Sequence, residues 1–105
     1  MTTDQVGLVL SALADPTRRQ LFGALVEKGR GSATTLARDL PVSRQAVVKH
    51  LQVLEGAGLV SGARSGREVV WTAQREPLEA SAQWLTRLAS TWDRRLARLK
   101  DRAEG

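Results

Sequence analysis

The chain has 105 residues, which is enough for one domain with a modest hydrophobic core. Its net charge of +5, from 16 basic and 11 acidic side chains, favours an anionic partner. It contains no cysteine, which excludes disulfides, thiolate metal sites and cysteine nucleophiles.

The first part of the chain predicts two helices. An apolar stretch from Val6 to Leu13 has loose helical spacing. Asp15 and Pro16 then mark a helix start, because aspartate caps free N–H groups and proline suits the first helical position. The expected buried face of this second helix comprises Leu21, Phe22, Leu25 and Val26, and Gly29 and Gly31 are expected to end it.

Two further helices with a tight turn between them are predicted next. Ser32 is expected to cap a helix that carries Leu36, Ala37 and Leu40 and ends at Pro41. Ser43 caps the following helix, in which Val47, Leu51 and Leu54 face inward, and Gly58 is its expected left-handed C-cap. A helix, a tight turn and a second helix over Thr34–Leu54 are the layout of a helix-turn-helix.

After this motif the pattern changes from helical to strand-like. Leu59–Arg64 and Arg67–Thr72 are predicted as two short strands, and Ser65-Gly66 as the turn that joins them. This hairpin, the wing, would span residues 59–72.

The last helix is expected to start at Glu76-Pro77 and to reach about Arg102. An apolar stripe repeats along it with heptad spacing and comprises Leu78, Ala82, Leu85, Ala89, Trp92, Leu96 and Leu99. Trp84 and Leu88 widen the stripe. A single terminal helix cannot bury so much apolar surface alone, so we expect a second copy of the chain to cover it. The alternative is packing on the first helix of the same chain.

Together these elements predict one domain over residues 1–105, mainly α with a small β-hairpin. The expected architecture is a winged helix-turn-helix of four helices, two strands and a fifth helix, dimeric through the terminal helices. The helix-turn-helix would occupy about residues 32–57 and the dimerisation helix about 76–102. The start of the chain has no basic and apolar leader pattern, and no apolar run approaches the ~18–20 residues of a membrane span. We therefore expect a cytoplasmic protein with no membrane partner.

The charge distribution points to double-stranded DNA as the partner. Residues 30–75 carry seven bases and three acids, a net charge of +4, whereas residues 1–29 are neutral and residues 76–105 carry +1. In a helix-turn-helix the start of the second helix enters the major groove. The residues expected there are Ser43, Arg44, Gln45, Val48 and Lys49, with Arg64 and Arg67 at the wing reaching phosphates or the minor groove. Taken alone, the wing arginines are also compatible with ordinary solvated turn charges.

The chain resembles the ArsR/SmtB-type winged-helix repressors over about residues 8–100. The matching segments are LADPTRRQLFGAL (13–25), VSRQAVVKHLQVLEGAGLV (42–60) and SGARSGREVVWT (61–72). The tail WLTRLASTWDRRLARLK (84–100) is similar to a metal-independent branch of the family. The resemblance implies five helices and a wing, a homodimer formed by the first and last helices, and repression by operator occupancy. Carried over by position, DNA contacts fall on Ser43, Arg44, Gln45, Val48, Lys49 and His50, with Arg64 and Arg67 on the wing.

The chain departs from the family in two respects. Many members have serine at the position of Val48, which suggests a different operator preference. Metal-sensing members carry cysteine on the third helix or histidine on the last, but here the third helix has no thiol and the last offers Glu79 and Asp93 but no histidine. We therefore expect no metal site and no cofactor.

Three questions stay open from the sequence. His50, the one histidine, either contacts phosphate or fills a half-buried structural position. Trp84 and Trp92 either line a pocket for an apolar ligand or fill the core. The fold also serves as a protein-interaction module, and a MarR-like regulator that responds to a small ligand is a near alternative. The effector is unknown, and we expect no enzyme, because no catalytic constellation is present.

Overall fold

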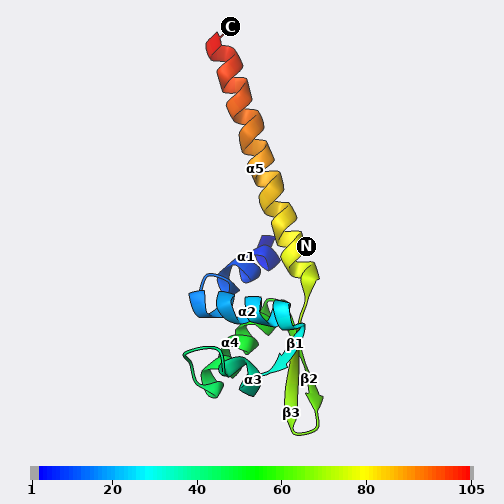
Figure 1. The fold of residues 1–105 in the computed structure, drawn as a ribbon. Helices are drawn as coiled ribbons and strands as arrows, with labels where there is room; N and C mark the ends of the chain where they lie inside the picture. The colour runs from blue at the N-terminus through cyan, green and yellow to red at the C-terminus, as the bar shows by residue number, and fades with distance from the viewer. Residues whose placement is uncertain (1–2, 105) are drawn as a thin grey trace.

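Four short helices and a small sheet form a head from which one long helix projects (Figure 1). The structure is a computed structural model and describes residues 3–104. In chain order the elements are α1 (Thr3–Ala12), α2 (Pro16–Lys28), β1 (Arg30–Ser32), α3 (Ala33–Ala37), α4 (Arg44–Gly56), β2 (Val60–Ser65), β3 (Glu68–Ala73) and α5 (Arg75–Glu104). The tip of the β2–β3 hairpin and the C-terminus of α5 lie at opposite ends of the molecule.

The predicted starts of three helices are confirmed by their capping hydrogen bonds. The Asp15 carboxylate accepts the Arg18 N–H at 3.0 Å, at the start of α2. Ser32 Oγ accepts the Thr35 N–H at 3.2 Å, and Ser43 Oγ accepts the Ala46 N–H at 3.1 Å. Each side chain satisfies an N–H group that the helix itself leaves without a partner.

The sheet has three strands, where the sequence predicted two. Strand β1 pairs with β3, so that the antiparallel order is β1-β3-β2. At three residues, β1 is too short to show an alternating pattern, and Gly31, interpreted as a helix end, lies in it. A Cβ on Gly31 would lie 3.3 Å from Leu36 Cγ, so this glycine lets β1 approach α3 closely.

The wing turn is also one residue later than predicted. Ser65 pairs with Glu68 at the end of the ladder, which leaves Gly66 and Arg67 as the two turn residues. Gly66 has a φ of 64°, the positive value that a type II′ hairpin turn needs at its first central position. Arg67 therefore lies at the hairpin tip itself.

Helix α3 is shorter than expected. It ends at Ala37, and the N–H groups of Arg38 and Leu40 donate to carbonyls three residues earlier, as in a tight turn. Proline disfavours the helical conformation of the residue before it. Leu40 precedes Pro41 and therefore lies outside the helix. Leu40 still packs against the core, as its apolar character predicts.

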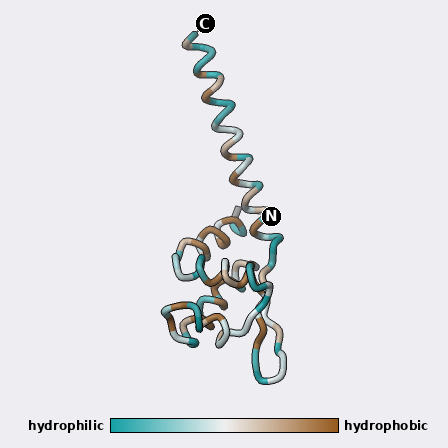
Figure 2. Tube along the Cα trace, in the orientation of Figure 1, coloured by the Kyte–Doolittle hydropathy of each residue, from teal (hydrophilic) through white to brown (hydrophobic). Residues whose placement is uncertain are grey.

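The core joins the helices to the sheet. The inward faces expected of α2 and α4 are confirmed: Leu21, Leu25, Val47, Leu51 and Leu54 are fully buried, although Val26 is 53% exposed. Trp71 of β3 closes the core on the sheet side. Figure 2 shows many apolar residues in the elements of the head and apolar and polar residues alternating along α5.

Helix α5 contacts the head only near its start. Pro77 and Ala80 are half-buried there and Ser81 is buried, whereas every described residue after Trp84 is exposed. The chain measures 69 × 27 × 21 Å as a result. No helix in the described range is long and apolar enough to cross a membrane.

Candidate nucleic-acid interface

The start of α4 presents a row of polar side chains to solvent. Ser43, Arg44, Gln45 and Lys49 are all exposed, on the side opposite to the buried Val47 and Leu51. The outward position that the sequence predicted for Arg44 and Gln45 is confirmed. Their side chains and the free N–H groups of the first helical turn can reach base edges and phosphates without any change in the core.

Val48 differs from this row. The sequence predicted that it faces outward, but it is half-buried and packs against the core. It lies one residue after the fully buried Val47, and it lines the hollow between α4 and the wing. Only part of its side chain is available for contact with another molecule.

Arg44 is held by a residue that the sequence reasoning did not single out. Its Nε donates a hydrogen bond to Thr34 Oγ1 of α3 at 3.1 Å. Nε is one of five guanidinium N–H donors, and the other four are on the two terminal nitrogens. Thr34 therefore fixes the base of the guanidinium group. No sequence pattern signals this contact, because the two residues are ten positions apart on different helices.

The wing arginines are brought to the same side as Arg44. Arg64, on β2, lies opposite Val69, and Arg67 lies in the turn, both exposed. A hollow of about 290 Å³ separates the wing from α3 and α4. Its lining includes Thr34, Arg44 and Val48 on the helical side and Arg67, Glu68 and Val69 on the wing side. Helix and wing thus form two walls of one concave, arginine-bearing surface.

His50 is half-buried further along α4. The pKa of Asp15 lies below its usual value, chiefly because its carboxylate accepts the Arg18 N–H.

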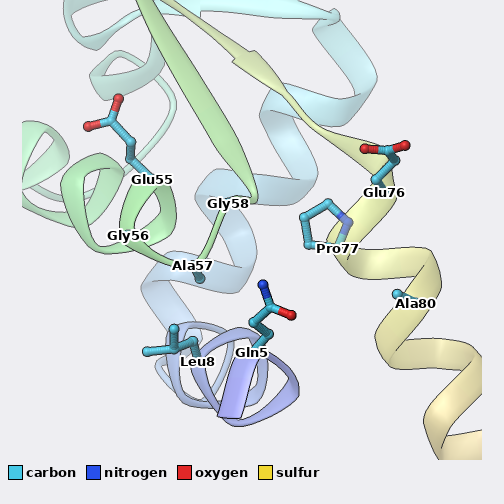
Figure 3. A pocket seen from close by; sticks show the side chains of 9 residues that line it. All are labelled: Gln5, Leu8, Glu55, Gly56, Ala57, Gly58, Glu76, Pro77 and Ala80. Atoms are coloured by element: carbon cyan, nitrogen blue, oxygen red, sulfur yellow. The ribbon is translucent and has the colours of Figure 1, made fainter. Parts of the chain in front are cut away.

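Another concavity, of about 520 Å³, lies at the junction of α1, α4 and α5 (Figure 3). Gln5 and Leu8 line it from α1, the Glu55–Gly58 segment from the end of α4 and the turn after it, and Glu76, Pro77 and Ala80 from α5. Its charged side chains, Glu55 and Glu76, are acidic and point away from Gln5 and Leu8. This surface does not suit nucleic acid.

The two tryptophans of α5 lie in different surroundings in the single chain. Trp84 is half-buried near the head, whereas Trp92 is 58% exposed on the projecting part of the helix. The hollow of about 440 Å³ beside Trp92 is lined by Leu85, Leu88, Ala89, Thr91, Trp92 and Arg95. A pocket that both indoles line near a dimer axis would involve a second copy of the chain, so this alternative stays a prediction.

No three histidine, cysteine or acidic side chains come together as metal ligands within residues 3–104. The acidic groups that the sequence offered on α5, Glu79 and Asp93, are both exposed. Glu79 forms an ion pair with Arg75 at 3.4 Å on the same helix.

Comparison with known proteins also indicates a helix-turn-helix in this chain. The sequence profile of the family described as "Helix-turn-helix domain" matches residues 13–62. The chain is 39% identical over 77 residues to the uncharacterized HTH-type transcriptional regulator YuzN of Bacillus subtilis, covering 68% of this chain and 84% of that protein.

Solved structures match over most of the chain. An ArsR-like transcriptional regulator from Rhodococcus sp. RHA1 superposes with a TM-score of 0.84 at 41% identity, covering 93% of this chain and 92% of the other. The homodimeric winged helix-turn-helix DNA-binding domain Mb0332 of Mycobacterium bovis superposes with a TM-score of 0.67 at 25% identity, covering 84% and 80%. The similarity thus includes the head and much of α5.

Proposed function

The chain belongs to the ArsR/SmtB-type family of helix-turn-helix transcriptional regulators, and we propose that it represses transcription by binding an inverted-repeat operator as a homodimer. The observation that carries this proposal is the concave surface between α4 and the wing, with Arg44 on one wall and Arg67 on the other. A dimer that occupies an operator blocks access of other proteins to the same DNA, and repression follows. Such a regulator acts in the cytoplasm, where bacterial DNA lies.

The proposed reading surface consists of residues in the first turns of α4. Arg44 and Gln45 are exposed there, and we propose that Arg44 binds guanine O6 and N7 through its two terminal nitrogens and that Gln45 binds adenine. The exposed part of Val48 meets a thymine methyl group. Ser43, Lys49 and His50 contact the phosphate backbone, which sets the register of the helix in the groove.

The wing is proposed to supply sequence-independent affinity. The guanidinium groups of Arg64 and Arg67 are exposed at its far end, where they reach phosphates or the minor groove beside the recognition helix. Since each neutralised phosphate releases counterions, affinity is expected to fall steeply with salt concentration.

The proposed dimer interface is the stripe of apolar side chains on α5. Four of its large members are 45–58% exposed in the single chain, namely Leu85, Trp92, Leu96 and Leu99. The remaining members are Leu78, Ala82 and Ala89. The homodimeric state of the Mb0332 domain supports the same assembly here. Two copies are also what an inverted repeat requires, since each half-site takes one recognition helix.

The proposal is tested with two arginine variants on operator DNA found by genome-wide capture and footprinting. We expect Arg44→Ala to cost about 1–3 kcal/mol at the operator and to relax base preference at one position. Arg67→Ala should weaken binding to operator and scrambled DNA by a similar factor. Arg75→Ala is the matched control, because it removes an exposed arginine outside this surface. Operator affinity that is unchanged in both test variants contradicts the assignment.

A further inference from the structure

One acidic side chain lies among the arginines of the proposed DNA-binding surface. The hollow of about 290 Å³ between the wing and the helices α3 and α4 is lined by two basic residues, Arg44 and Arg67, and by one acidic residue, Glu68. Glu68 is the first residue of β3, where it pairs with Ser65 and directly follows Arg67 of the turn. The wing therefore carries a cation at its tip and an anion one residue further from the tip.

The carboxylate of Glu68 is not used to hold the fold together. Within residues 3–104 it is exposed and forms no ion pair or hydrogen bond. Two other acidic side chains of the head do have partners, because Asp15 caps α2 and Asp39 forms an ion pair with Lys28 at 2.8 Å. The strand pairing of Glu68 involves only its backbone. Its charge is therefore free to act on a molecule that enters the hollow.

We propose that Glu68 makes the DNA-binding surface selective by keeping the DNA backbone out of the hollow between the wing and the helices. This inference rests on the proposed function and adds a residue that limits sequence-independent binding. Specificity is the difference between two binding free energies. A group that weakens the wrong complex therefore increases specificity as effectively as a group that strengthens the right one.

Without this carboxylate the hollow would suit a phosphate of any DNA sequence. Arg44 and Arg67 stand on opposite walls of one concave surface, and guanidinium groups bind phosphate well. A duplex whose backbone entered the hollow would engage both arginines without any base contact. Such a complex gains the same electrostatic free energy on every sequence, which is the origin of non-specific DNA binding. The charge of Glu68 opposes this complex, because it lies in the lining where the phosphate would be held.

The same charge affects the operator complex less. In the proposed complex Arg44 binds a base in the major groove and Arg67 reaches a phosphate from the tip of the hairpin, so no phosphate needs to enter the hollow. The amino groups that a carboxylate can bind in the major groove belong to cytosine and adenine, and α4 rather than the wing occupies that groove. Repulsion at Glu68 thus acts mainly against complexes that lack base contacts.

The substitution Glu68→Gln tests the inference, because glutamine keeps the size of the side chain and removes its charge. The full-length variant is titrated with operator duplex and with a scrambled duplex of the same length and composition, over a series of salt concentrations. We expect the scrambled duplex to bind about 5–10-fold more tightly and the operator to change by less than about twofold, so that the ratio of the two affinities falls. The salt slope on scrambled DNA should steepen by about one, since one more phosphate is neutralised.

Glu55→Gln is the matched control. Glu55 is an exposed acidic residue of the same helix, but it lines the concavity at the junction of α1, α4 and α5 (Figure 3). Both variants raise the net charge of +5 by one unit, so a general effect of charge appears equally in both. Only an effect of the hollow is confined to Glu68→Gln. Thermal unfolding of the two variants checks that the fold is retained.

Each remaining outcome has one meaning. An affinity for scrambled DNA that rises no more in Glu68→Gln than in Glu55→Gln overturns the inference, because the position of the charge is then irrelevant. An equal gain on operator and scrambled DNA also overturns it, since specificity is then unchanged. A loss of operator affinity in Glu68→Gln overturns it in favour of a direct contact between the carboxylate and a base. A wild-type chain that binds neither duplex instead overturns the proposed function itself.

Discussion

Ser43 has two separate tasks at the start of α4. Its hydroxyl accepts the Ala46 N–H at 3.1 Å and so caps the helix, and the same residue is exposed in the proposed contact with phosphate. A loss of DNA binding on replacing it with alanine would therefore be ambiguous. Two substitutions together separate the tasks, because aspartate caps a helix as well as serine does but repels phosphate.

We expect Ser43→Ala to lower the free energy of unfolding by about 1 kcal/mol through loss of the cap. Ser43→Asp should keep that stability and still weaken operator binding by about tenfold or more, since a carboxylate near phosphate is repelled. Urea denaturation and a gel-shift titration measure the two quantities. A Ser43→Asp variant that binds DNA as tightly as the wild type would show that this side chain is far from the backbone.

Thr34 is expected to act on DNA recognition through Arg44. The substitution Thr34→Val keeps the shape of the side chain but removes the oxygen that accepts from Arg44 Nε. Discrimination at the base that Arg44 reads should fall by about 2–10-fold, the value of one ordinary hydrogen bond. Binding to scrambled DNA should change little, because the positive charge remains.

The control for this prediction is Thr34→Ser, which retains a hydroxyl and should recover most of the discrimination. Both variants are measured against operators with each of the four bases at the position concerned. Equal discrimination by Thr34→Val and the wild type would mean that Arg44 is oriented by the DNA alone.

At the scale of elements, the wing depends on one turn. Gly66 has a φ of 64°, and no atom lies within 4 Å of the position that a Cβ would occupy. The cost of Gly66→Ala is therefore backbone strain alone, about 1–2 kcal/mol. We expect this strain to loosen the hairpin and to weaken binding to all DNA sequences, as for Arg67→Ala.

Gly23→Ala is the matched control for the wing prediction. Gly23 lies inside α2 with equally open surroundings, but its φ is helical, so alanine should stabilise the fold by about 0.5–1 kcal/mol. Thermal unfolding should therefore show lower stability for Gly66→Ala and higher stability for Gly23→Ala. DNA titration measures the binding of both variants. A Gly66→Ala variant with wild-type affinity would indicate that the wing is not needed for binding.

The sequence predicted those elements whose signals are local. The caps Asp15, Ser32 and Ser43 each have a carboxylate or hydroxyl that bonds an N–H three residues later, and this chemistry does not depend on the rest of the fold. Strand β1 was missed because its three residues pair with β3, 40 positions away. A pairing of that kind has no signature in the short segment itself.

The candidate site was predictable to a similar extent. The exposed row at the start of α4 follows from helical periodicity once Val47 and Leu51 are inside. The half-buried state of Val48 and the contact between Thr34 and Arg44 depend on where the wing and α3 lie relative to α4. Such tertiary contacts become visible only in the folded chain.

At the scale of the whole molecule, the single chain is unusually extended. Its radius of gyration is 18.3 Å, whereas a compact chain of this length has about 13 Å. The excess comes from α5, whose large apolar side chains are about half exposed beyond the head. Full burial of a large apolar side chain contributes about 1.5–3 kcal/mol, so burial of the exposed half of each contributes about half of that value. Pairing of two α5 helices therefore has enough driving force to hold a dimer together.

The dimer is tested by one charged substitution on the stripe. Leu85 is 45% exposed in the single chain, so Leu85→Glu should leave the head folded but oppose burial of this position in the interface. Because a two-fold dimer contains the change twice, we expect its dissociation constant to rise at least about a hundredfold. Gln83→Glu, on the exposed side of α5 away from the stripe, is the control and should remain dimeric.

The same variant shows what the dimer contributes to DNA binding. A monomer contacts one half-site and so neutralises about half as many phosphates as the dimer does. The slope of the logarithm of the binding constant against the logarithm of salt concentration is proportional to that number. Leu85→Glu should therefore bind the operator with about half the wild-type slope, whereas Gln83→Glu should keep the full slope. Sedimentation gives the oligomeric state of each variant, and the salt titration gives its slope. A monomeric variant with the full slope would mean that one head makes all the contacts with DNA.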